Sequence, residues 1–271
     1  MNRKLNIISW NVNHRGNRGR GQIPLWIQDE ICGADIIVLT EFPCQCPERD
    51  AFMGALAAQG YHSSASENPG GNDVLIAVKS CCPILRCSWE PCYGADGIPE
   101  NLRVDIRCEE KVLTIFGVRI KALRGERQKS QKRRAELQWV IKELADVNHS
   151  VVITGDFNSN RRETVDKIWS MDAMKSMLKG FTLYTPEGSS VFEEAPWKAP
   201  SHEFPYDHFA VKNAELSNPI YDRDFTERHP QIYTLRRDFR EPWYPGAQEK
   251  DLHAIDAPYP DHAILKGTLI L

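Results

Sequence analysis

The stretch SVVITGDFN, residues 150–158, joins a β-branched apolar run to a polar turn. The run predicts a buried strand, and Gly155 predicts that the chain turns at the end of that strand. Asp156 and Asn158 follow, so a carboxylate and an amide are available to a ligand there. Turns of this composition are more often simple caps, in which the aspartate binds its own backbone. The stretch alone leaves both interpretations open.

Three other predicted strands also begin or end beside polar side chains. The strands are residues 5–10, 35–40 and 263–271, and the side chains are those of Asn11, Asn13, Glu41, Asp261 and His262. Carboxylate and amide oxygens are hard ligands that suit Mg²⁺ or Mn²⁺, whereas a zinc site favours Cys and His at short spacing. Four such strand ends in one chain predict a divalent-metal site.

These motifs resemble those of the endonuclease/exonuclease/phosphatase superfamily, which includes pancreatic-type deoxyribonucleases, abasic-site endonucleases, neutral sphingomyelinases and inositol polyphosphate phosphatases. The matching motifs are SWNVN at 9–13, TE at 40–41, GDFNS at 155–159, YDHF at 206–209 and DH at 261–262. The resemblance implies a four-layer α/β/β/α sandwich of the DNase I type, in which two β-sheets are flanked by helices and the site lies at one edge. It also implies hydrolysis of phosphodiesters with the help of Mg²⁺ or Mn²⁺.

The resemblance also implies which residues hold the metal. Glu41 is the expected central ligand, and Asn11 and Asp261 are expected to complete or orient the ligand set. Asn13, in the same motif as Asn11, is a further candidate ligand.

The catalytic roles follow from the same resemblance. Asp156 and Asn158 are expected to position or deprotonate the attacking water and to hold a phosphate oxygen. His262 is expected to contact the scissile phosphate or to act as a general acid or base. Asp207 is expected to orient His262 and to fix the tautomer of its ring.

Two positions depart from the family pattern. Arg119 stands where many relatives carry His or Tyr. An arginine can bind phosphate through two N–H groups but does not act as a proton donor, so we expect electrostatic help from Arg119. Tyr206 stands before Asp207 where relatives commonly carry Arg or Ser, which puts the substrate specificity in doubt. Further candidates for phosphate contacts are Lys121, Arg15 and Arg124.

The pattern of the whole chain predicts one mixed α/β domain over residues 1–271. Strands are predicted over 5–11, 35–40, 73–79, 102–108, 111–120, 150–155, 209–212 and 263–271, with a hairpin turn at 109–110. Helices are predicted over 24–31, 48–59, 128–146 and 162–179. Residues 213–260 are interpreted as an aromatic- and arginine-rich insertion, which either contacts substrate or caps the sheet.

Composition narrows the possible classes of protein. Apolar residues make up 41% of the chain and the mean hydropathy is -0.47, so a membrane-spanning protein is not expected. With a net charge of -3, the chain is not basic overall as general DNA-binding proteins are. Any contact with nucleic acid must therefore be made by a local group of basic residues. Without an apolar leader the chain is expected in the cytoplasm. Its eight cysteines are expected to be reduced, since a domain of this size needs no disulfides.

Three functions are compatible with the sequence. The first is a metal-dependent nuclease acting on DNA or RNA. The alternative is a phosphatase or phosphodiesterase acting on inositol phosphates, phospholipid head groups or small nucleotides, although residues 205–208 lack the Trp-Cys-Asp-Arg run of inositol 5-phosphatases. The third is an inactive scaffold that binds nucleic acid or protein, which the full set of motif residues disfavours. The oligomeric state is not predicted.

Overall fold

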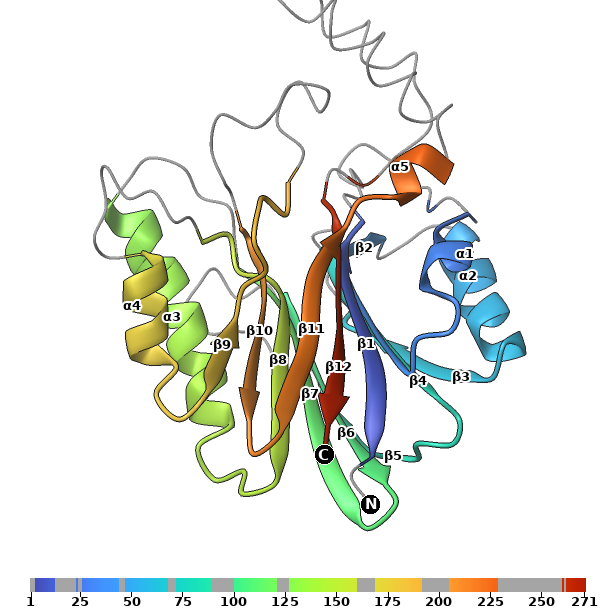
Figure 1. Cartoon of the computed structure of the whole chain (residues 1–271), viewed down its shortest axis with the longest axis horizontal. Helices are drawn as coiled ribbons and strands as arrows, with labels where there is room; N and C mark the ends of the chain where they lie inside the picture. The colour runs from blue at the N-terminus through green and yellow to red at the C-terminus, as the bar shows by residue number, and fades with distance from the viewer. Residues whose placement is uncertain are drawn as a thin grey trace, which may run out of the picture.

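The computed structural model describes residues 3–12, 23, 26–43, 47–67, 72–88, 100–120, 127–159, 169–191, 205–228, 260 and 262–271. In this part of the chain the strands form two mixed sheets of six strands each. The sheets pack face to face, with helices on both outer faces (Figure 1). The four-layer α/β/β/α sandwich expected from the sequence is confirmed.

The first sheet has the strand order β11-β12-β1-β2-β4-β3. Its strands are β1 (Lys4–Asn11), β2 (Ile36–Pro43), β3 (Tyr61–Ala65), β4 (Asn72–Lys79), β11 (Glu215–Asp222) and β12 (Ile264–Ile270). Strand β1 runs parallel to β2 and antiparallel to β12. The ends of β1 and β2 therefore lie at the same edge as the beginning of β12.

The second sheet has the strand order β5-β6-β7-β8-β10-β9. Its strands are β5 (Ile84–Ser88), β6 (Asn101–Cys108), β7 (Lys111–Arg119), β8 (Ser150–Asp156), β9 (Thr182–Tyr184) and β10 (Asp207–Lys212). Strand β7 runs parallel to β8 and antiparallel to β6, and β10 runs antiparallel to β8. The ends of β7 and β8 and the beginnings of β6 and β10 thus share one edge.

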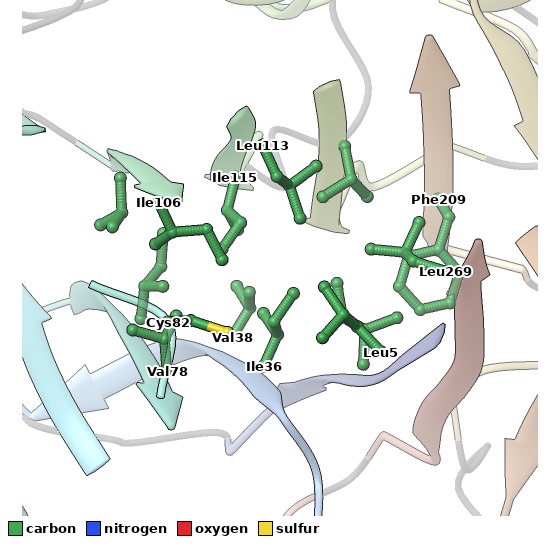
Figure 2. Packing of buried hydrophobic residues seen from close by; sticks show 14 of the residues in the cluster. Leu5, Ile36, Val38, Val78, Cys82, Ile106, Leu113, Ile115, Phe209 and Leu269 are labelled. Atoms are coloured by element: carbon green, nitrogen blue, oxygen red, sulfur yellow. The ribbon is translucent and has the colours of Figure 1, made fainter. Parts of the chain in front are cut away.

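The core between the sheets is built from alternate residues of facing strands. Leu5 and Ile36 of the first sheet meet Leu113, Ile115 and Phe209 of the second (Figure 2). Successive side chains of a strand point to opposite faces, so the residues between these face the helices. This alternation buries both faces of central strands such as β2 and β8.

Helices cover the two outer faces. The first sheet is covered by α1 (Trp26–Ile31) and α2 (Pro47–Ala58), and the second by α3 (Arg127–Glu143) and α4 (Met171–Met177) (Figure 1). In α3, Leu137 and Val140 are buried against the second sheet, as their helical spacing predicts. No helix in the described part of the chain has both the length and the apolar character needed to cross a membrane.

Several elements have no clear signal in the sequence. Strands β3, β5, β9 and β11 and the short helix α5 (Phe225–Arg228) were not predicted. Strand β11 falls within the 213–260 segment, so the first part of that segment belongs to the sandwich. It contains Pro219, pairs with β12 through an irregular register and leaves Ile220 exposed, which together hide the strand pattern. The remainder of the segment, from 229 to 259, lies outside the described residues.

Candidate active site

The predicted site residues that the structure describes come together because the strand ends that carry them share one edge of the sandwich. In the second sheet Arg119 of β7 pairs with Asp156 of β8, and Asp156 pairs with Asp207 of β10. Paired residues on neighbouring strands point to the same face of a sheet. These three charged side chains therefore form a row. From the first sheet, Asn11 ends β1 and Glu41 lies in β2.

The GDFN turn positions Asp156 and Asn158 through an unusual backbone. Gly155 has a φ of 136°, and a Cβ atom there would lie 2.0 Å from the carbonyl oxygen of Val118. Asn158 has a φ of 47°, and its backbone N–H donates to Asp156 Oδ1 over 2.8 Å. Asn158 Nδ2 donates to Asp156 Oδ2 over 2.8 Å and to the carbonyl of Ile120 over 2.6 Å. The turn is therefore capped by the Asp156 carboxylate, and the same carboxylate also lies in the candidate site.

Asn11 connects the carboxylates of the two sheets. Its Nδ2 lies 3.3 Å from Glu41 Oε1 and 3.1 Å from Asp156 Oδ2. Glu41 sits where the pairing of β2 with β4 shifts register, between Leu39 and Phe42, and has a φ of 52°. A bulge of this kind changes the direction of a side chain. The bulge therefore aims Glu41 at the shared edge.

Arg119 joins Glu41 to a third carboxylate. Its Nε and Nη2 both lie 2.8 Å from Glu41 Oε1, and its Nη1 lies 2.7 Å from Glu100 Oε2. Burial by itself lowers the pKa of Arg119, but the charges of Glu41 and Glu100 outweigh burial and raise it. The guanidinium is therefore a permanent cation inside the site. In this structure it binds the carboxylates of Glu41 and Glu100.

Asp207 and His262 form a buried pair. His262 Nδ1 lies 2.7 Å from Asp207 Oδ2. An Nδ1–H donated to the carboxylate places the lone pair of the neutral ring on Nε2. The carbonyl of His262 accepts from Trp10 Nε1 over 2.9 Å, and Ser190 Oγ accepts from the backbone N–H of Asp207. Among the described residues, Asp207 Oδ1 has no hydrogen-bond partner.

Burial is the main influence on the protonation of Asp156 in the metal-free protein. Burial raises its pKa to about 7. His262 and Arg119 act against this increase, whereas Asp207 and Glu41 add to it. A cation bound beside Asp156 would favour the carboxylate form.

The residues present fit a hard divalent cation. Within the described residues, the N–H groups that contact Glu41 all converge on Oε1, which leaves Oε2 for a cation. Asp156 and the amide of Asn11 lie beside it. Mg²⁺ is commonly held by one or two carboxylates while it keeps several waters. Over the same residues, no three His, Cys, Asp or Glu side chains form a metal-binding cluster.

Five predicted residues cannot be placed. The candidate ligands Asn13 and Asp261, and the candidate phosphate-binding residues Lys121, Arg15 and Arg124, lie outside the described residues. The cysteine pair at 44 and 46 is outside them as well. The described cysteines, Cys32, Cys81, Cys82, Cys87 and Cys108, carry free thiols, as expected.

The structure adds residues that no motif indicated. The carbonyl of Asn158 accepts from Trp169 Nε1 over 3.1 Å and from Arg133 Nη1 over 3.5 Å, so two donors hold the turn in place. Arg133 lies in a run of basic residues, and this run is the sequence feature that could have indicated a role for it near the site. Glu100 precedes β6 without any motif, so its role is visible only in the folded chain.

The chain was compared with known families and solved structures. A model described as the Endonuclease/Exonuclease/phosphatase family matches residues 8–213. The chain belongs to this family. Members of the endonuclease/exonuclease/phosphatase family are hydrolases that act on phosphodiester bonds, and they generally use divalent metals. No curated protein sequence matches the chain.

Three solved structures of this family illustrate the similarity of fold. A protein of the family from Beutenbergia cavernae has a TM-score of 0.71 at 13% identity, over 99% of this chain and 72% of that one. TDP2 from D. rerio, complexed with a single-strand DNA product, has a TM-score of 0.63 at 15% identity, over 98% of both chains. The human Nocturnin catalytic domain with a bound sulfate anion has a TM-score of 0.62 at 14% identity, over 99% of this chain and 95% of that one. At these identities the similarity shows the fold.

Proposed function

We propose that the chain is a phosphodiesterase dependent on Mg²⁺ or Mn²⁺, and that its substrate is DNA or RNA. The observation that carries the proposal is the contact of Asn11 with both Glu41 and Asp156, beside the pair formed by Asp207 and His262. This arrangement gathers hard oxygen ligands and a histidine with a fixed tautomer at one edge. Oxygen ligands of this kind can hold a catalytic metal, and a histidine can serve in acid–base catalysis of phosphodiester hydrolysis.

Each side chain has a role in the proposed reaction. Glu41 and Asn11 hold the divalent cation, together with Asp261 and Asn13 if these reach it. The cation supplies Lewis-acid polarisation of the phosphoryl oxygen. Asp156, as a carboxylate, orients the attacking water and accepts its proton, and Asn158 fixes the direction of that carboxylate.

The remaining residues act on the phosphate. When its ring carries both protons, His262 donates from Nε2–H to a phosphate oxygen and can pass that proton on as charge develops. Asp207 accepts from Nδ1–H, which stabilises this charged form and leaves Nε2–H available to the phosphate. Arg119 adds a permanent positive charge close to the reacting centre, which favours an anionic transition state. This second set comes mainly from the second sheet.

Two observations support a nucleic acid as substrate. Helix α3 carries the basic residues Lys132 and Arg133, and Arg133 contacts the carbonyl of Asn158, so at least one basic side chain lies beside the site. The similar structure of TDP2 contains a single-strand DNA product. The net charge of -3 and the ion pairs of Arg119 favour instead a small phosphate ester, which needs fewer phosphate contacts.

The proposal is tested by product analysis. Purified protein with Mg²⁺ or Mn²⁺ is incubated with single-stranded DNA, duplex DNA, structured RNA, bis-p-nitrophenyl phosphate and inositol phosphates. The variants are Glu41→Gln and His262→Ala, and the matched control is Glu110→Gln, an exposed hairpin residue at the opposite edge.

The outcomes separate the candidate functions. Cleavage of a polynucleotide that EDTA and both site variants abolish, and that the control retains, supports a nuclease. Turnover of the small esters alone moves the function to a small-molecule phosphodiesterase or phosphatase. Absence of activity in the wild-type protein on every substrate contradicts the proposal and favours an inactive scaffold.

A further inference from the structure

The guanidinium of Arg119 is shared between two carboxylates that have different tasks. Nε and Nη2 bind Oε1 of Glu41, a proposed metal ligand, at 2.8 Å. Nη1 binds Oε2 of Glu100, which has no proposed contact with metal or substrate, at 2.7 Å. The exposed fractions of the three side chains are only 13%, 16% and 9% for Arg119, Glu41 and Glu100, so these contacts are poorly screened by water.

Glu100 is anchored beside Arg119 by the backbone. The N–H of Arg119 donates to the carbonyl of Glu100 over 2.8 Å, where the pairing of β6 with β7 ends. The side chain of Glu100 therefore stays within reach of the guanidinium if the contact with Glu41 is weakened. Arg119 thus has a second carboxylate partner that is already in place.

A divalent cation and the guanidinium both favour the negative charge of Glu41. A cation bound at Oε2 reduces the attraction between Arg119 and Glu41. When Glu100 is present, Arg119 still has a carboxylate partner, so the weakened attraction to Glu41 costs less free energy. Without Glu100, the buried guanidinium loses one of its two contacting carboxylates, and the cost of drawing Glu41 away from it rises.

We propose that Glu100 is a positioning residue that increases the affinity of the site for its divalent cation by acting on Arg119. Arg119 is the counter-ion of Glu41 in the metal-free protein and competes with the cation. Glu100 holds the guanidinium and so reduces this competition. The inference rests on the proposed function because it requires that Glu41 binds a divalent cation.

The alternative is a simple effect of charge at a distance. Removal of the Glu100 anion weakens binding of the metal ion, and removal of the Arg119 cation strengthens it, even if the two side chains do not act through each other. Under that alternative, Glu100 acts directly on the metal and its effect persists when Arg119 is absent. Under the proposal, Glu100 acts through Arg119 and its effect disappears. A double-mutant cycle therefore distinguishes the two.

The test measures Mn²⁺ binding to metal-free protein by isothermal titration calorimetry, with free Mn²⁺ counted by electron paramagnetic resonance. The variants are Glu100→Gln, Arg119→Gln and the double variant, with Glu110→Gln as the control. Neither readout needs a substrate or turnover. We expect Glu100→Gln to raise the Mn²⁺ Kd about fivefold and Arg119→Gln to lower it about fivefold, as for contacting residues.

The decisive comparison is in the Arg119→Gln background. There we expect Glu100→Gln to change the Kd by less than about twofold, as for residues that no longer interact. An equal effect of Glu100→Gln in both backgrounds overturns the proposal, and so does weaker binding in Arg119→Gln. If Arg119→Gln does not fold, Arg119→Met supplies a second background without the cation, and the same comparison is made there.

The proposed function can fail separately. If wild-type protein binds no Mn²⁺, or binds it equally well after Glu41→Gln, the metal site itself is wrong and both proposals fall. If Glu41→Gln abolishes binding but the cycle shows no coupling, the inference on Glu100 alone is wrong.

Discussion

Asn11 Nδ2 lies 3.1 Å from Asp156 Oδ2, so the last residue of β1 in one sheet contacts the last residue of β8 in the other. The same nitrogen contacts Glu41 Oε1 at 3.3 Å. One amide therefore sets the spacing of two carboxylates that come from different layers of the sandwich.

Replacement of Asn11 by Ala removes this contact. We expect the activity found in the substrate screen to fall about 10- to 100-fold, because residues that orient metal ligands typically have effects of this size. The free energy of unfolding should fall by about 1–2 kcal/mol, as for a lost buried hydrogen bond. The measurements are kcat/KM and urea unfolding. Asn6→Ala, near the start of the same strand, is the matched control: it removes only an exposed hydrogen bond from Thr268 Oγ1, so kcat/KM should not change and stability should change by less than about 0.5 kcal/mol.

Asp207→Asn should disturb the histidine without removing it. An amide can donate to Nδ1 of His262 and so favour the other tautomer, and we expect kcat to fall by about 10²-fold or more, in the range for acid–base catalysis. Residues that act as one unit have non-additive effects. His262→Ala should therefore add little to the loss in the Asp207→Asn background. Full additivity in the double variant would mean that the two residues act independently.

Stability of the metal-free protein should depend on pH through Asp156. Burial raises the pKa of Asp156 from 3.8 to about 7 in the folded state. The folded state then binds the proton more tightly than the unfolded state, so the contribution of Asp156 to stability is greatest below pH 4 and is lost as the pH rises to about 7.

The test of this prediction is urea unfolding in EDTA between pH 5 and pH 8. Asp156→Asn removes the titrating group, so the stability of the variant relative to wild type should increase with pH, by an amount on the order of a few kcal/mol. Mg²⁺ should stabilise the wild type more at pH 8 than at pH 5. If the difference in the free energy of unfolding between variant and wild type stays constant with pH, the raised pKa of Asp156 is contradicted.

Gly155→Ala should unfold the site. The added Cβ would lie 2.0 Å from the carbonyl oxygen of Val118, and the φ of 136° is strained for alanine. We expect a loss of more than about 3 kcal/mol in the free energy of unfolding. Gly54→Ala is the control, because Gly54 lies within α2 with open space around it. That change should stabilise the protein by about 0.5–1 kcal/mol.

The sequence was most informative where a strand is buried on both faces. The mainly apolar runs before Asp156 and Asn11 predict strands whose ends agree with β8 and β1 to within one residue, because each run stops at a polar side chain. The position of Asp207 beside Asp156 follows from antiparallel pairing, which the sequence alone does not specify. The resemblance to a known family supplied a different pairing, that of Asp207 with His262, which lie 2.7 Å apart.

Other features depend on contacts between distant parts of the chain. Arg119 and Glu41 are 78 positions apart and belong to different sheets, so no local pattern joins them. Glu100 acquires its place from the pairing of β6 with β7. In β11 the solvent-facing side and the bulge leave little apolar alternation to detect. Register and sheet packing, which are properties of the folded chain, decide all three.

The division of the site between two sheets also affects how the protein can lose activity. Glu41 belongs to the first sheet and Asp156 to the second, and the layer that joins them is the apolar core seen in Figure 2. A partly unfolded state in which the sheets separate would keep its strands and yet have no site. Far-UV circular dichroism would count such molecules as folded, whereas an activity assay would count them as lost. An activity assay therefore reports whether the two sheets remain packed against each other.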